Sequence, residues 1–234
     1  MSDPAARDPA TPPQGPRRRA KRRPAAAEPL RGPAPDGRGT PGPPDLRPQL
    51  GGVLAVARKY GYDGDHARQV ADLALRLFAA LPEAHGLGAD WAPLLEHAAL
   101  LHDIGYFIRA RGHHRHSRYL IRHDALLADY PRPWLDVVAL IAHNHRKRPR
   151  RAPGGWARGL GEAALALAAL LRIADGLDYG HDGGARIALA SIRRGGVEIA
   201  VSGVPLGSMA RILRRKSRLF SARFALPVTF VSGA

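Results

Sequence analysis

Residues 94–105 read LLEHAALLHDIG, a stretch that predicts a buried helix ending in a polar pair. The apolar side chains recur at helical spacing, at Leu94, Leu95, Ala98 and Leu101. Asp90 before the run and Gly105 after it are typical helix limits. At the end of the helix, the imidazole of His102 and the carboxylate of Asp103 can both reach one metal ion, although adjacent helical residues point about 100° apart.

The same helical spacing extends from Gly51 to about Asp178 and predicts an all-helical middle. Signals for helix starts are Asp63 or Asp65, Asp90, Ser117, Pro133, and Gly159 or Gly161. Signals for helix ends are Pro82, Gly105, Pro149 and Gly180. After about residue 186 the pattern predicts strands at 187–192 and 197–201, a helix at 207–224 and a strand at 228–231. The expected fold is mainly α, a helical bundle with a small C-terminal α+β appendage.

Residues 1–50 differ in composition, with 13 of the 21 prolines, ten Lys or Arg residues and no aromatic residue. Such a segment cannot bury enough apolar surface to offset its ordering entropy, so we predict that it is disordered. The expected domains are therefore 1–50, 51–182 and 183–234. A basic cluster at 17–23 is followed by Pro24 and Glu28, where a signal peptide would need an apolar run. No apolar run reaches 18 residues, and we expect a cytoplasmic protein without membrane contact.

The composition limits the chemistry that this chain can perform. It has no cysteine, which excludes disulfides, thiolate metal sites and a cysteine nucleophile, and leaves 11 histidines and the carboxylates as metal ligands. The formal net charge is +16, from 36 Lys and Arg against 20 Asp and Glu. This excess favours phosphate-rich partners such as nucleotides, polyphosphate or nucleic acid.

Polar residues on the inward stripes of three helices form a candidate metal site. His66 lies one turn before Val70 on the buried face of its helix, and Asp175 follows Leu171 on another. A buried lone carboxylate or imidazole is costly unless it is paired or binds a metal. Together with His102 and Asp103, these side chains suit a divalent ion in the core of a bundle, such as manganese, magnesium or another transition metal.

This pattern resembles the HD superfamily of metal-dependent phosphohydrolases, which has a His, then a His-Asp pair, then an Asp. Four stretches are similar to the C-terminal HD domain of exopolyphosphatase and guanosine-pentaphosphate phosphatase (Ppx/GppA) proteins: LLHDIGY at 100–106, HHRHS at 113–117, HR at 145–146 and LRIADGLD at 171–178. The resemblance covers about residues 50–180. It implies an HD-domain helical bundle and assigns the metal to His66, His102, Asp103 and Asp175.

The resemblance does not extend to exopolyphosphatase activity. In that family this chemistry is attributed to actin-like ATPase-fold domains that precede the HD domain. The proline-rich residues 1–50 cannot encode such domains. We therefore expect a stand-alone HD-type enzyme without exopolyphosphatase activity.

Two further histidines occupy positions that resemble the second metal site of bimetallic HD proteins. They are His113, just before the third expected helix, and His145, late in the fourth. Helical periodicity places His145 on an inward stripe with Val138 and Ile141, and His143 on the outward side.

The case for a second ion is weaker than the case for the first. For His113, only the resemblance favours it over His114 and His116. Tyr62 stands where bimetallic relatives place an acidic residue, four positions before the first His. We therefore expect one ion more than two.

The leading interpretation is a phosphohydrolase that acts on a nucleotide or another phosphate ester or anhydride, with Asp103 as a catalytic residue. A divalent ion would polarise a phosphoryl oxygen and activate a water molecule for attack on phosphorus. Arg146, next to His145, could neutralise phosphate charge. We interpret the rest of the basic run at 147–151 as a solvated loop, and Glu96 and His97 as a polar helix face.

The rival interpretation is a non-catalytic module that binds polyphosphate or nucleic acid on a basic surface. One helix face carries a basic stripe, formed by Arg211, Arg214, Arg215 and Arg218. Turnover that depends on metal and on Asp103 would indicate the enzyme. Binding that persists without Asp103 and weakens with salt would indicate the module. The partner is a phosphate-containing small molecule or polyphosphate in either case, with nucleic acid as a further possibility, and the sequence does not indicate an oligomeric state.

Overall fold

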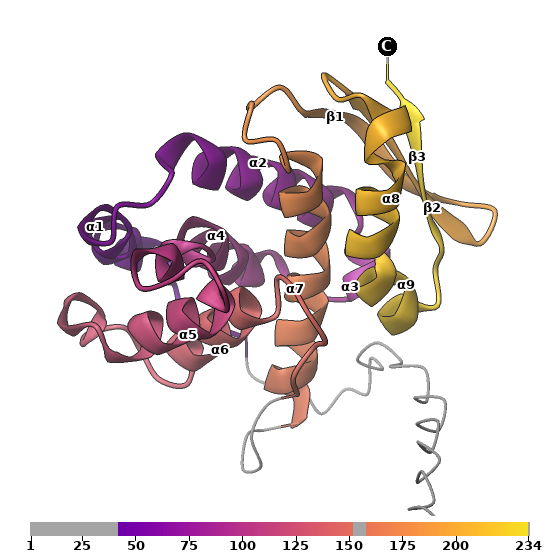
Figure 1. Ribbon diagram of the computed structural model, residues 1–234. Coiled ribbons are helices and arrows are strands. Elements are labelled where there is room, and N and C mark those ends of the chain that lie inside the picture. The colour runs from indigo at the N-terminus through magenta and orange to yellow at the C-terminus, as the bar shows by residue number, and fades with distance from the viewer. Residues whose placement is uncertain (1–41, 152–157, 234) are drawn as a thin grey trace, which may run out of the picture.

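The computed structural model describes residues 42–151 and 158–233, and the fold is mainly α with a small C-terminal sheet (Figure 1). The helices before the sheet are α1 (Leu50–Lys59), α2 (Gly64–Ala80), α3 (Pro82–His85), α4 (Ala92–Leu101), α5 (His113–His123), α6 (Trp134–His143) and α7 (Arg158–Leu177). The C-terminal part contains β1 (Arg186–Arg193), β2 (Gly196–Ser202), α8 (Leu206–Lys216), α9 (Arg218–Phe224) and β3 (Val228–Ser232). This architecture confirms the predicted fold class.

Helix α7 is the central element of the molecule. It packs against α2, α4 and α6 of the bundle on one side and against α8 and α9 on the other, as Figure 1 shows. All residues from 163 to 178 are buried. Many of them are alanines, whose small side chains let neighbouring helices approach closely on every face. No helix among the described residues is both long and apolar enough to span a membrane.

The sheet has the order β1-β2-β3. β1 and β2 are antiparallel and are joined at Arg194 and Gly195, both with positive φ, as a two-residue hairpin turn requires. β2 and β3 are parallel, so the chain must cross over between them, and it does so through α8 and α9. Ile199 of β2 and Leu213 of α8 belong to the same hydrophobic core as the bundle. The predicted border at residue 183 therefore lies within one continuous core.

Several predicted helix limits are correct and others are wrong. Asp63 caps α2, since its carboxylate accepts the backbone N–H of His66 at 3.1 Å. Ser117 caps no helix: it lies inside α5, where its hydroxyl donates to the His102 carbonyl at 2.6 Å and accepts the Gly105 N–H at 2.9 Å. The fourth predicted helix ends at His143 rather than near Pro149. The predicted helix at 207–224 is divided into α8 and α9 at Ser217.

Packed structure includes residues on the N-terminal side of the predicted border at residue 50. Leu46 is fully buried in the core, and a short 3-10 turn at Arg47–Gln49 leads directly into α1. The average composition of residues 1–50 gives no indication that Leu46 is buried. Residues 1–41, which include the basic cluster at 17–23, lie outside the described residues, so their predicted disorder stays a prediction.

Candidate metal centre

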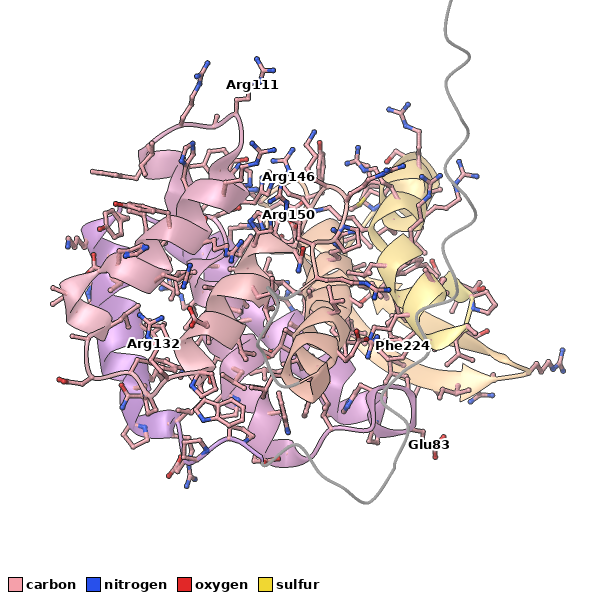
Figure 2. The ribbon with its side chains drawn as sticks, turned by 90° about the horizontal axis from the view of Figure 1, so that it is seen from below. Glu83, Arg111, Arg132, Arg146, Arg150 and Phe224 are labelled. Carbon is pink, nitrogen blue, oxygen red and sulfur yellow. The ribbon has the colours of Figure 1, made fainter. Side chains whose placement is uncertain are left out.

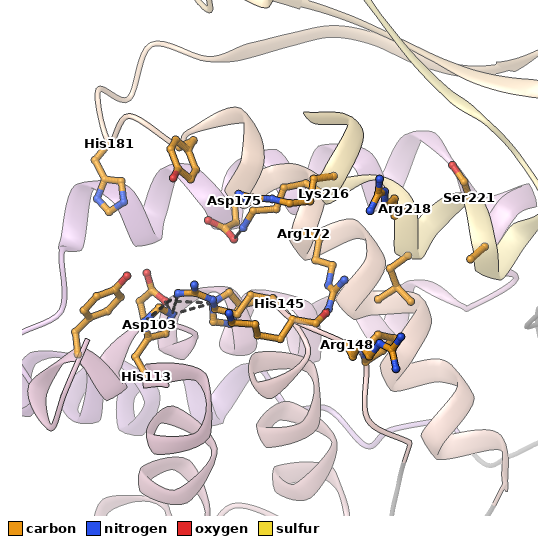
Figure 3. A pocket seen from close by; sticks show the side chains of 18 of the residues that line it. Asp103, His113, His145, Arg148, Arg172, Asp175, His181, Lys216, Arg218 and Ser221 are labelled. Carbon is orange, nitrogen blue, oxygen red and sulfur yellow. Dashed lines mark hydrogen bonds and ion pairs between the residues drawn. The ribbon is translucent and has the colours of Figure 1, made fainter. Parts of the chain in front are cut away.

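The candidate ligands converge because several helix ends meet at one place. His66 lies in the first turn of α2, His102 and Asp103 directly follow α4, and His113 begins α5. His145 follows α6 by two residues. Figure 3 shows Asp103, His113 and His145 close together, with ion pairs drawn between them. Helix ends carry backbone groups without helical partners, and these groups here orient the side chains.

His102, His113 and His145 place Nε2 3.1–3.4 Å from a carboxylate oxygen of Asp103, because their Nδ1 atoms are engaged elsewhere. The Nδ1 atoms of His102, His113 and His145 lie 2.7, 3.1 and 2.6 Å from the carbonyl oxygens of Ala99, Ala110 and Ala142. A carbonyl oxygen only accepts, so each Nδ1 carries the proton and donates it. His66 Nδ1 lies 2.7 Å from Asp178 Oδ2, a carboxylate partner of the kind that fixes metal-binding imidazoles.

Three buried polar atoms at this point make no hydrogen bond: His66 Nε2, His102 Nε2 and Asp103 Oδ1, the last of which contacts only the Nε2 atoms of His113 and His145 among the described residues. Buried polar atoms are nearly always satisfied, so three together need an explanation. Ligand atoms of His66, His102 and Asp103 lie within 4.8 Å of one another. Two ligands of one ion stand at most about 4.4 Å apart, given bonds of about 2.0–2.2 Å. With small adjustments these residues fit a divalent ion, with positions left for substrate.

A second set shares Asp103 with the first. Asp103 Oδ1 lies 3.1 Å from His113 Nε2 and 3.4 Å from His145 Nε2, and all three ligand atoms are within 4.8 Å of one another. The two Nε2 atoms are 3.1 Å apart, although both are acceptors when each Nδ1 carries its proton. A cation between them would remove this repulsion. The second set is therefore as complete as the first, despite Tyr62.

The electrostatics of the cluster favour the protonation states that metal binding needs. Burial lowers the pKa of His66 and lowers that of His145 well below its usual value, which keeps both imidazoles neutral. Burial opposes ionisation of Asp103, but His102, His113 and His145 outweigh it: a proton taken up by the cluster resides on an imidazole and not on this carboxyl, whose pKa stays well below its usual range. Neutral imidazole and ionised carboxylate are the ligand forms.

Asp175 lines the same cavity but belongs to neither set of ligands. Its carboxylate accepts a hydrogen bond from the ammonium of Lys216, at the end of α8. Burial would raise the pKa of Asp175, but the charge of Lys216 together with His145 and His102 holds it below its usual value. The structure thus brings His66, His102 and Asp103 together and places the fourth predicted ligand beside them with another partner.

A cavity of about 1180 Å³ opens above the cluster and is strongly cationic. Besides Asp103 and Asp175, its charged lining consists of Arg146, Lys147, Arg148, Arg172, Arg215, Lys216 and Arg218. Arg146, the predicted phosphate ligand, places Nη1 3.3 Å from His113 Nε2. Figure 2 shows Arg146 near the upper edge of the molecule in this view, between the bundle and the C-terminal helices. The run at 147–151 is therefore partly cavity wall rather than wholly a solvated loop.

Two predicted orientations are wrong. His143 is buried rather than outward, with its ring 5.1 Å from that of His114, because α5 covers this side of α6. His97 is also fully buried and does not belong to a polar helix face: its Nδ1 lies 2.8 Å from the Tyr130 hydroxyl oxygen. Helical periodicity gives relative directions but does not show which neighbours cover a face.

Sequence reasoning gave no role to four residues at this site. Asp178, fully buried, holds His66 and lies three residues after Asp175, a spacing that could have revealed it. The ring of His181 stacks on His66 at 3.7 Å, and that of Tyr106 stacks on His113 at 3.9 Å. Lys216 stands between Arg215 and Arg218 of the basic stripe, so its sequence context gives no signal of a contact with the site. Of that stripe, only Arg215 and Arg218 line the cavity.

Comparison with known proteins identifies what this arrangement is similar to. The model of the family described as Ppx/GppA phosphatase, domain III, matches residues 51–193. A protein named guanosine-5'-triphosphate,3'-diphosphate pyrophosphatase from Pseudoalteromonas atlantica is 32% identical over 87 residues, which is 37% of this chain and 17% of the relative.

Proteins with the same name show similar matches in two other organisms. The one from Aeromonas hydrophila is 30% identical over 124 residues, 51% of this chain and 24% of the relative. The one from Pseudoalteromonas translucida is 28% identical over 116 residues, 49% of this chain and 22% of the relative. The chain thus spans about a quarter or less of the length of each of these relatives.

Proposed function

This chain belongs to the Ppx/GppA phosphatase domain III family, and on that basis we propose that it is an HD-type, metal-dependent phosphohydrolase. The proposed substrates are nucleotides or other phosphate esters and anhydrides. The observation that carries the proposal is the convergence of His66 Nε2, His102 Nε2 and Asp103 Oδ1, all buried and without hydrogen-bond partners, at a cationic cavity. The relatives are named for a nucleotide pyrophosphatase activity, which supports a phosphate-containing substrate.

The residues of the chain would have different roles in this reaction. His66, His102 and Asp103 would hold one divalent ion, with Asp175 as a fourth ligand when it turns from Lys216 toward the ion, and Asp103, His113 and His145 could hold a second. Such ions, manganese or magnesium for example, supply Lewis acidity toward a phosphoryl oxygen and make water more acidic. Asp178 and the carbonyls of Ala99, Ala110 and Ala142 keep the imidazoles oriented.

The cations of the cavity would bind and orient the substrate. Arg146 is close enough to His113 to contact a phosphoryl group held at the ligand cluster. Arg172 is buried and fixed, since it donates to the carbonyls of Asn144 and Lys147, both at 2.6 Å. It therefore holds the loop that presents Arg146 and Lys147 to the cavity. Positive charges that are held in place before the reaction stabilise the negative charge that develops during phosphoryl transfer.

A phosphate-release assay on the full chain tests the proposal. Pyrophosphate, tripolyphosphate, nucleoside triphosphates and simple phosphate monoesters would each be incubated with Mn²⁺, with Mg²⁺ and with EDTA. We expect release from at least one substrate that EDTA abolishes and that is lost in Asp103→Asn. If no substrate is hydrolysed while tripolyphosphate binds equally well to wild type and Asp103→Asn, the chain is a polyphosphate-binding module instead.

A further inference from the structure

Lys216 reaches the candidate metal centre from a part of the fold that is remote in sequence. Its ammonium donates to Asp175 Oδ2, across 41 residues, and the two side chains are only 11% and 12% exposed. Figure 3 shows the pair on the α7 and α8 side of the cavity, facing the Asp103 side. Both residues line the cavity. An ion pair this buried is more constrained than a surface pair, because little water is available to hydrate either charged group in place of its partner.

The packing of α7 is adapted to this contact. A Cβ atom at Gly176, next to Asp175, would stand 2.9 Å from Lys216 Cγ and 3.1 Å from Lys216 Cβ, so a larger residue there would displace the lysine stem. Leu213 of α8 and Ser217, which directly follows the helix, lie on either side of Lys216 in the chain, and both are buried and fix the backbone position. The lysine is therefore built into the helix interface.

We propose that Lys216 is a further residue of the metal site, which competes with the divalent ion for Asp175. The inference rests on the proposed function. Asp175 and Asp103 are the two carboxylates of the cavity, and a divalent ion and an ammonium that share Asp175 repel each other. Ion binding and the Lys216–Asp175 contact therefore oppose each other, and this opposition links the metal site to α8.

Removing the lysine distinguishes competition from a purely structural pair by the sign of the effect. We would titrate Mn²⁺ calorimetrically into the full-length wild type and Lys216→Met. Competition predicts a Kd for Mn²⁺ lowered by roughly tenfold in Lys216→Met, because one nearby positive charge is gone. Arg214→Met, which removes the same charge from an exposed position of α8 outside the cavity lining, should change the Kd by less than about twofold. Lys216→Arg, which keeps the charge, should bind Mn²⁺ like the wild type.

Hydrogen exchange on the wild type gives a second readout that needs no substitution. If Mn²⁺ draws Asp175 away from Lys216, the amides in the last turn of α8 should exchange faster with Mn²⁺ than without it. An unchanged or raised Kd in Lys216→Met, or α8 exchange that slows or stays the same while Mn²⁺ binds the wild type, would overturn competition and leave the metal site standing. Absence of Mn²⁺ binding to both wild type and Lys216→Met would instead overturn the metal site, and the inference with it.

Discussion

Two parts of the bundle contain a fully buried histidine whose Nε2 atom has no hydrogen-bond partner, and only one of them resembles a metal centre. At His97, in the middle of α4, Nδ1 lies 2.8 Å from the Tyr130 hydroxyl oxygen, and the ring packs edge-on against that tyrosine. At His102, five residues later, Nε2 lies 3.4 Å from Asp103 Oδ2. Both histidines occur in one short stretch of sequence and both are buried.

The difference lies in what surrounds the unpartnered nitrogen. His97 belongs to neither candidate ligand set, whereas His102 shares one with His66 and Asp103. His97 lies within the helix, where neighbouring turns occupy the space around it, whereas His102 lies at the helix end, where the chain turns and other helix ends converge. A buried histidine thus gains metal-binding geometry from a carboxylate and from its place at a helix end, and burial alone is not sufficient.

Among the substitutions that separate the two regions, Asp103→Asn has the largest expected effect on Mn²⁺ affinity and on hydrolysis. The change removes the carboxylate shared by both ligand sets, so Mn²⁺ affinity should fall by at least roughly 100-fold and hydrolysis should be abolished. His97→Gln should leave Mn²⁺ affinity within about twofold of the wild type. Calorimetric titration of the three proteins measures this. If His97→Gln weakened binding as much as Asp103→Asn, the contrast between the regions would be false.

A smaller effect is expected from Asp178→Asn, which leaves every proposed ligand in place. Asparagine can turn its amide nitrogen toward His66 Nδ1 and so no longer favours the tautomer with a free Nε2. Loss of such an outer partner typically costs about 10–100-fold in metal affinity. The affinity for Mn²⁺ should fall within that range, and circular dichroism should show an intact fold. Wild-type affinity in Asp178→Asn would mean that His66 needs no orienting carboxylate.

The smallest effect concerns stability at His97. Burial lowers the pKa of His97 to about 4, from about 6.5 in an unfolded chain. Because the unfolded state then binds the proton more tightly, stability from this residue is complete above about pH 6.5 and is lost as the pH falls toward 4. Between pH 7 and pH 5 the loss should amount to about 1–2 kcal/mol.

Urea denaturation at the two pH values tests this expectation. His97→Gln should lose less stability than the wild type over the same interval. The exposed His123→Gln provides the control, and its loss should match that of the wild type. A His97→Gln variant that loses as much stability as the wild type would show that His97 is not held neutral by burial.

Much of the fold could be read from the sequence because it depends on local signals. The periodicity of α2, α4 and α7, the alternation in β1 and β2, and a glycine turn between these strands are all short-range features, although the sequence indicates Gly195 and Gly196 and the turn lies one residue earlier, at Arg194 and Gly195. The break at Ser217 has no such signal, since neither Gly nor Pro occurs there, and it follows from how α8 and α9 pack on α7. The burial of Leu46 likewise depends on tertiary contacts in a segment whose composition suggests none.

The residues of the candidate site likewise divide into those that the sequence predicts and those whose role depends on tertiary packing. His66, His102 and Asp103 follow from helix stripes and helix ends, and His113 and His145 from a family resemblance supported at His145 by periodicity. The pairing of Asp175 with Lys216 could not be predicted, because it requires the crossover that lays α8 on α7. The burial of His97 and His143 depends in turn on which elements cover α4 and α6. Sequence patterns therefore predict the candidate ligands, whereas tertiary packing determines which groups these ligands contact.

Anomalous X-ray scattering from crystals of the full chain soaked in Mn²⁺ tests the central claim most directly. The account predicts a manganese peak about 2.0–2.3 Å from His66 Nε2, His102 Nε2 and an oxygen of Asp103, and no peak at His97. A second peak, if present, should lie between Asp103, His113 and His145. Crystals that diffract well and show no manganese at Asp103, or show it only elsewhere, would contradict the claim that these helix ends form a metal centre.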